Sequence, residues 1–193
     1  MREDIAAVNR ESGLHIQLVT DEPKAFDSTM ARYGKFSGVR NYLAVIGKKE
    51  KELPERCGYY GEKLILKAQM LGLNSCWVGL TYKKIPSAFS LAKGEKLVAV
   101  ISLGYGLNEG KPHKGKSFDE VVDVGEVFPD WFRRGVESAL LAPTAVNQQK
   151  FCFILKGDQV EAKAGRGFYS KVDLGIVKYH FEIGANREKE IWF

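Results

Sequence analysis

The amino-acid sequence predicts an α+β fold in which a mainly antiparallel central sheet is flanked by helices. Three compact apolar runs of buried-strand type, at 41–47, 97–103 and 151–155, supply the sheet. Helical periodicity separates these runs, but without the strict strand–helix–strand alternation of a parallel doubly wound sheet. With 193 residues, of which 45% are hydrophobic, we expect one domain with a real core. We expect it to comprise two related halves, approximately 1–125 and 126–193.

The clearest helix is predicted over residues 58–71. Apolar side chains recur there at i, i+4, i+8 and i+11 and therefore share one face, namely Tyr60, Leu64, Ala68 and Leu71. Gly72 follows where a left-handed C-cap is expected. Before this helix, the sequence predicts a helix end that stops at Gly13, a short strand over 15–20, and a loop with one helical turn over 21–40.

The rest of the chain is divided by turn-forming residues. Pro143 ends a helix that Asp130 can cap, and Gly157-Asp158 forms a hairpin turn. The predicted elements here are an extended segment over 73–80, a short helix over 86–92, a helix over 131–141, a strand over 160–162 and a closing helix over 172–183.

The net charge is +5, from 29 Lys and Arg against 24 Asp and Glu, and it suits an anionic ligand such as a phosphate or nucleotide. The excess is dispersed except around 111–116, and no nucleic-acid-binding motif accompanies it, so we expect no nucleic-acid partner. No apolar run approaches the ~18 residues of a membrane helix. The first residues also lack the apolar core of a signal peptide, so a cytoplasmic location is expected.

The three cysteines form no CxxC pair, and the three histidines show no zinc-ligand spacing. Reduced thiols and no metal are expected. Nor is there a Ser/His/Asp arrangement or a paired-carboxylate cluster, so the sequence offers no side-chain nucleophile or general acid.

Residues 110–117 (GKPHKGKS) match the GxxxxGK[ST] pattern of phosphate-binding loops. That chemistry needs a strand directly before the loop and a long helix directly after it. Here the preceding strand is predicted to end near Leu103, and the following SFDEVVDVGEVF is too short and too β-branched for the helix. A basic loop that meets a phosphate by charge, or is merely solvated, is the favoured interpretation.

Two further segments have both an ordinary and a functional interpretation. In GLNSCWVG (72–79), the turn at Val78-Gly79 allows close backbone approach to a ligand, although Trp77 and Gly79 also suit a plain core and turn. In APTAVNQQ (142–149), hydroxyl and amide groups follow a helix break that is expected to hold the segment extended, where they could bond a heterocycle. A polar loop with a turn at Asn147 explains the same residues.

Taken in order, these segments resemble the FMN-dependent nitroreductase family, in its single-chain branch where two related halves form a pseudo-dimer. GYYGEKLILKAQMLGLNSCWVG (58–79) is similar to the family's central helix and flavin-facing turn, and LVAVISLGYG with HKGKSFDEVV (97–122) to its strand and basic phosphate loop. DWFRRGVESALLAPTAVNQQKFCF (130–153) resembles the APSxNxQPW element, and VDLGIVKYHFEIGA (172–185) the closing helix.

The resemblance implies a role for each matched position. The backbone of Val78 and Gly79 would face flavin N5 and Trp77 would flank the ring, while Lys114 and Lys116 would meet the phosphate. Three residues of the later segment would bond the ring or ribityl chain, namely Thr144, Asn147 and Gln148. Such a site is composite, because its parts lie far apart in sequence. The resemblance assigns no role to Asp173 or His180, and His180 is expected to be structural.

The activity implied is a ping-pong oxidoreductase reaction, in which NAD(P)H reduces FMN and the electrons pass to a nitroaromatic, quinone or similar small-molecule acceptor. A monomeric pseudo-dimer or a homodimer is expected. The alternatives are a non-catalytic or degenerate flavin- or nucleotide-binding protein of the same fold and, third, a P-loop phosphotransferase.

The sequence departs from the family in one respect. The family's Arg-[Ser/His]-Ser-x-Arg motif, whose arginines grip the FMN phosphate, is not found before Ile5. This departure predicts weaker FMN binding, because charge-assisted hydrogen bonds from arginine are of the stronger class.

Overall fold

The computed structural model describes residues 1–108, 110, 112–123 and 127–193. Lys111 of the basic segment and the predicted boundary between halves at 125/126 lie outside these residues. The chain divides into two compact units, residues 1–53 with 63–110 and residues 54–62 with 111–193. Helix α3 (Leu53–Met70) therefore contributes its early turns to the second unit and its last turns to the first.

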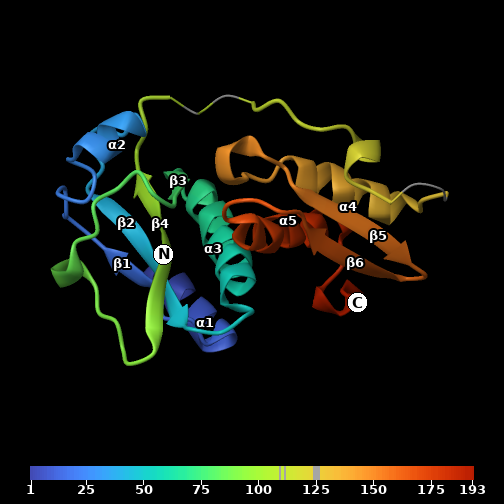
Figure 1. Ribbon diagram of the computed structural model, residues 1–193, viewed down its shortest axis with the longest axis horizontal. Helices are drawn as coiled ribbons and strands as arrows, with labels where there is room; N and C mark the ends of the chain where they lie inside the picture. Colours follow the sequence, from blue (N-terminus) through green and yellow to red (C-terminus); the bar gives the residue numbers. More distant parts are fainter. Residues whose placement is uncertain (109, 111, 124–126) are drawn as a thin grey trace. The chain divides into compact units, whose positions relative to one another are not determined.

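The first unit contains an antiparallel four-stranded sheet with the strand order β1-β2-β4-β3 (Figure 1). The bounds are β1 (Gln17–Val19), β2 (Asn41–Lys48), β3 (Asn74–Val78) and β4 (Glu95–Gly104). Each contains or falls within a segment predicted to be extended, and the antiparallel pairing confirms the predicted type of sheet. The helices are α1 (Arg2–Ser12), α2 (Thr29–Tyr33) and the single 3₁₀ turn η1 (Pro86–Ala88).

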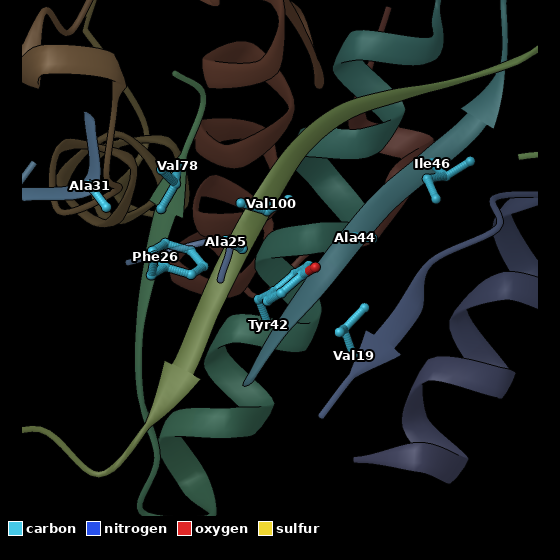
Figure 2. Packing of buried hydrophobic residues seen from close by; sticks show 9 residues of the cluster. All are labelled: Val19, Ala25, Phe26, Ala31, Tyr42, Ala44, Ile46, Val78 and Val100. Atoms are coloured by element: carbon cyan, nitrogen blue, oxygen red, sulfur yellow. The ribbon is translucent and has the colours of Figure 1, made fainter. Parts of the chain in front are cut away.

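One face of this sheet carries a hydrophobic cluster, shown in Figure 2, to which the strands and the segment before β2 contribute. Phe26 and Tyr42 meet edge-on at 5.8 Å between ring centroids, and Phe26 also contacts Phe36. The clustered residues are Val19, Ala25, Phe26, Ala31, Tyr42, Ala44, Ile46, Val78 and Val100. Leu43 and Val45, which alternate with these on β2, are also buried, so both faces of the central strands are covered.

Local signals explain the ends of these elements. Gly72 has a φ of +75°, as predicted for a left-handed C-cap, and the Leu73 N–H bonds the Ala68 carbonyl at 3.0 Å. Helix α3 begins five residues earlier than predicted, because Pro54 occupies the first turn, where its missing N–H costs no helical hydrogen bond. Within the loop over 21–40, the Ser28 side chain caps α2.

The second unit contains α4 (Asp130–Leu140), the hairpin β5 (Phe151–Lys156) and β6 (Gln159–Ala164), and α5 (Ser170–Ala185). The hairpin turns at Gly157-Asp158 as predicted. It forms a two-stranded sheet of its own, so the strand predicted at 151–155 does not join β2 and β4 in one central sheet, contrary to the sequence-based expectation. The 3₁₀ turns are η2 (Phe118–Glu120), η3 (Ala145–Asn147) and η4 (Lys189–Ile191). Asp130 does not cap α4; Pro129 holds the cap position and Asp130 is already helical.

Helices α3 and α5 approach each other backbone to backbone at two glycines of the second unit. A Cβ atom added at Gly58 would lie 2.0 Å from the Val172 carbonyl oxygen, and one at Gly175 would lie 1.9 Å from the Glu55 carbonyl oxygen. Neither distance is sterically possible, so only glycine permits this crossing.

Polar side chains of α3 and α5 are paired around this crossing. His180 Nε2 lies 2.9 Å from Glu62 Oε1 in a buried pair, which agrees with a structural role for this histidine. The Tyr59 hydroxyl and the Trp192 indole N–H both donate to the Glu182 carboxylate at 2.5 Å. Burial raises the pKa of Glu182, because the carboxylate has left water. These bonds therefore satisfy a group that would otherwise be costly to bury.

Replacing Gly175 with alanine is expected to lower the free energy of unfolding by about 2 kcal/mol, because overpacking a close contact typically costs about 1–3 kcal/mol. Chemical denaturation followed by circular dichroism measures the change. Gly104→Ala is the control, since a Cβ at Gly104 meets nothing within 4 Å. Equal stabilities of the two variants would contradict the observed helix crossing.

Candidate functional site

The predicted site residues occupy three segments, and each segment lies within one of the two units. Trp77, Val78 and Gly79 belong to the first unit, at the end of β3. The basic loop, residues 112–117, and the polar turn, residues 144–149, belong to the second. The structure brings the basic loop and the polar turn into direct contact, as the hydrogen bonds below show.

Val78 and Trp77 lie on an edge strand, because β3 is the last strand of the sheet. The Val78 side chain is 2% exposed and belongs to the hydrophobic cluster of Figure 2. Trp77 is half-buried and alternates with it, so its side chain lies on the other face of the strand. An edge strand directs half of its backbone polar groups away from the sheet. Backbone rather than side-chain contact is therefore what this segment is suited to offer a ligand.

The first unit also contains a pocket of about 810 Å³ at the end of the sheet where β4 finishes. Lys35 and Arg40 supply positive charge to its lining, with Cys76 and Tyr105 among the other lining residues. None of the three predicted flavin-facing residues lines this pocket. It is therefore a separate feature from the turn at the end of β3.

The basic loop presents two ammonium groups. Lys114 is exposed and Lys116 half-buried, and among the described residues no carboxylate lies within ion-pair distance of either. Nearby, the Ser117 backbone N–H and hydroxyl hold the pKa of Glu120 below its ordinary value, with a smaller contribution from the two lysine charges. Two ammonium groups on one loop are a donor set that suits a phosphate.

The loop lacks the geometry of a P-loop. Strand β4 ends at Gly104, and the loop is followed by the single turn η2 rather than by a supporting helix. The backbone N–H groups of Lys116 and Ser117 are already used, at 2.8 Å each, by Gln149 Oε1 and Glu120 Oε2. These two N–H groups cannot also cradle a phosphate, so the P-loop arrangement is not available to them.

The polar turn is not extended, contrary to the sequence-based expectation. It forms η3 and contains three non-glycine residues with positive φ: Val146 at 48°, Asn147 at 54° and Gln149 at 44°. A β-branched residue in this region is a strained outlier. Pro143 ends the helix as expected. Tertiary hydrogen bonds then hold the following residues in left-handed conformations, which the sequence pattern does not predict.

Those hydrogen bonds use the predicted side chains. The Asn147 amide donates to the Lys114 carbonyl at 2.9 Å, and the Thr144 hydroxyl accepts from the Gln149 backbone N–H at 3.1 Å. The Gln148 amide donates at 2.7 Å both to the Phe168 carbonyl and to the Asp173 carboxylate. The amide N–H groups proposed for a flavin are thus also part of the framework of the second unit.

Sequence reasoning missed two residues of this framework, Gln149 and Asp173, which are each 3% exposed. Asp173 accepts from the Ala145 N–H at 2.9 Å and from Gln148, although burial raises the pKa of its carboxyl group. A buried carboxyl group that accepts two hydrogen bonds stabilises the segments that supply the donors. For Gln149, the sequence signal was its place in a run of adjacent amide residues. For Asp173 there was no sequence signal, because its hydrogen-bond partners lie far away in sequence.

The chain thus combines an antiparallel α+β fold with a candidate site that offers backbone, amide and ammonium groups. The family model described as "Putative TM nitroreductase" matches residues 1–185, and the chain belongs to this family. Membership supports a general oxidoreductase activity. The sequence matches none of the curated proteins.

Several solved structures are similar to this chain, and the first of those that follow shares its fold. A "putative nitroreductase" from Thermotoga maritima MSB8 is 20% identical with a TM-score of 0.64, over 91% of this chain and 69% of that chain. A "Putative NADH dehydrogenase/NAD(P)H nitroreductase" from Parabacteroides distasonis ATCC 8503 is 21% identical with a TM-score of 0.47, over 65% and 87%. An "FMN-dependent Nitroreductase" from Clostridium difficile R20291 is 17% identical with a TM-score of 0.41, over 59% and 81%.

Two further findings concern the described part of the chain. None of its helices is both long and apolar enough to cross a membrane. Among the same residues, His, Cys, Asp and Glu side chains do not gather in threes as a metal site would require.

Replacing Val146 with glycine is expected to raise the free energy of unfolding by up to about 1 kcal/mol. The left-handed conformation costs an L-residue about 1–2 kcal/mol, and glycine avoids this cost while losing roughly 0.5–1 kcal/mol of chain entropy. Val146 is 93% exposed, so little packing is lost. Urea denaturation measures the change.

Val146→Ala is the matched control, because it shortens the side chain but keeps the Cβ atom. It should gain less than the glycine variant. A glycine variant less stable than the unaltered protein would show that the turn does not hold this conformation in solution.

Proposed function

We propose that the protein is an FMN-dependent oxidoreductase that passes electrons from NAD(P)H to a nitroaromatic, quinone or similar acceptor by a ping-pong mechanism. Membership of the nitroreductase family supports the class of reaction. The observation that carries the cofactor assignment is the pair of lysines on the basic loop, which form no ion pair within the described part of the chain, together with the contact of this loop with a turn rich in amides.

The donor set agrees with FMN segment by segment. Lys114 and Lys116 would hold the phosphate by charge, and the polar turn, with Thr144, Asn147 and Gln148, would offer hydroxyl and amide groups to the ring or ribityl chain. In the first unit, Val78 and Gly79 would present backbone toward N5, and Trp77 would flank the ring. The edge position of β3 supports backbone contact of this kind.

Bound FMN would supply the redox chemistry: a hydride and a proton, from NAD(P)H and solvent, reach the acceptor as two electrons and two protons, converting a quinone to a hydroquinone. The residues of this chain bind and orient; none of the assigned positions has to act as a nucleophile or a general acid. Charge near the phosphate serves affinity, and the backbone near N5 serves orientation.

Replacing both Lys114 and Lys116 with alanine should weaken FMN binding, and the loss should be greater at low salt, because exposed charges are screened as the ionic strength rises. Fluorescence titration with FMN at two salt concentrations measures this. The double variant Lys49→Ala/Lys51→Ala removes the same charge from exposed positions of the first unit and is the control. Unchanged affinity in the loop variant would contradict the phosphate role.

Flavin absorbance of the purified protein tests the proposal as a whole. Protein that is yellow and bleached by NAD(P)H, with the colour restored by a quinone, supports the enzyme. Yellow protein that NAD(P)H does not bleach would favour the non-catalytic flavin-binding alternative. Colourless protein that does not bind added FMN would contradict the cofactor assignment.

A further inference from the structure

Gln149 connects the basic loop to the polar turn through four hydrogen bonds. Its side-chain amide donates to the Lys114 carbonyl at 2.9 Å and to Asn147 Oδ1 at 2.7 Å, and its carbonyl oxygen accepts from the Lys116 N–H at 2.8 Å. Its own backbone N–H donates to Thr144 Oγ1 at 3.1 Å. The residue is buried, so these bonds form away from competing water.

We propose that Gln149 is a positioning residue, which fixes the basic loop on the polar turn so that Lys114 and Lys116 are held for the phosphate of the flavin. This inference rests on the proposed function and deepens it. The inference follows from the contacts of the Gln149 side chain.

The geometry shows how one side chain contacts the backbones of both lysines. The bonds to the Lys114 carbonyl and the Lys116 N–H lie on either side of Gly115, the most conformationally free residue of the loop. The carboxamide thus replaces the peptide group of a neighbouring strand and fixes both lysine backbones at once. Without it, the Lys116 N–H would lose its partner, and only the Asn147 amide would still hold the Lys114 carbonyl.

The turn that carries Gln149 is itself anchored from its other side. Asp173 on α5 accepts from the Ala145 N–H at 2.9 Å and from the Gln148 amide at 2.7 Å. His113 adds a third attachment of the loop, with Nε2 3.0 Å from the Leu140 carbonyl at the end of α4. The strained φ values of Val146 and Asn147 persist because the turn is fixed at both ends.

The test compares the affinities for FMN and for riboflavin, which lacks the phosphate. In Gln149→Met, a substitution of similar size without hydrogen bonding, we expect the preference for FMN over riboflavin to fall about tenfold, toward that of Lys114→Ala/Lys116→Ala. A merely structural role would weaken both flavins equally and leave their ratio unchanged, which would overturn the inference. Gln159→Met, the same substitution at an exposed position of β6, should leave both affinities unchanged.

A double-mutant cycle makes the test sharper. If Gln149 acts through the lysines, then removing the lysines in the Gln149→Met background should cost much less FMN affinity than removing them in the unaltered protein. If the losses of FMN affinity were fully additive, the inference would be overturned, since the lysines would then bind FMN equally well without Gln149.

A measurement on the unaltered chain does not depend on how the variants fold. The Lys116 amide hydrogen should exchange with solvent at least about tenfold more slowly than that of Gly115, because it is bonded to a buried side chain. Equal exchange rates for the Lys116 and Gly115 amide hydrogens would overturn the inference that Gln149 fixes the loop. If the unaltered protein binds neither flavin, the proposed function fails and the inference falls with it. If it binds FMN and Gln149→Met keeps the same FMN-to-riboflavin ratio, the inference alone fails.

Discussion

The backbone contact between α3 and α5 is the constraint on which the second unit depends. Gly58 admits the Val172 carbonyl and Gly175 admits the Glu55 carbonyl, so the two helices lie closer than side chains would permit. This closeness fixes where the first turn of α5 lies. Asp173, the residue after Val172, is placed by it and in turn holds Ala145 and Gln148. The polar turn and the basic loop follow from that anchor.

The same closeness determines which polar groups the unit can bury. Glu62 pairs with His180, and Glu182 with Tyr59, because the two helices bring them within hydrogen-bond distance. Trp192, which follows η4, adds a second donor to Glu182. A buried carboxylate without such donors would be costly. The aromatic core beside them, with Phe153 and Phe181 at 4.8 Å between centroids, excludes water from these bonds. Packing and polar satisfaction thus support one another in this unit.

The candidate site combines a rigid framework with exposed charge. Gln149 and Asp173 are buried and bonded, whereas Lys114 is exposed and Asn147 is partly committed to the framework. A lysine contributes more to binding a phosphate when its backbone is fixed, because less conformational freedom is lost. The strained residue Val146 lies in the same turn as Gln149.

Hydrophobic pattern determined much of the fold from the sequence alone. The runs at 41–47, 97–103 and 151–155 became β2, β4 and β5, Gly72 adopted the expected left-handed conformation, and Gly157-Asp158 formed the expected hairpin turn. These features are local, because burial periodicity and glycine's freedom act over a few residues. The sequence pattern placed the start of α3 at residue 58 instead of Leu53. Proline has a low helix propensity, but the first turn of a helix accepts it.

The sequence by itself determined the type of sheet, the family and the segments that carry candidate ligand groups. Only the tertiary structure decided that residues 144–149 turn left-handed instead of running extended, and that Gln149 and Asp173 organise them. The physical reason is distance along the chain: the bonds of Gln149 to the basic loop span 33 to 35 residues, and those of Asp173 span 25 and 28. A hydrogen bond of that span depends on how helices and hairpin pack, and no local pattern of residues encodes it.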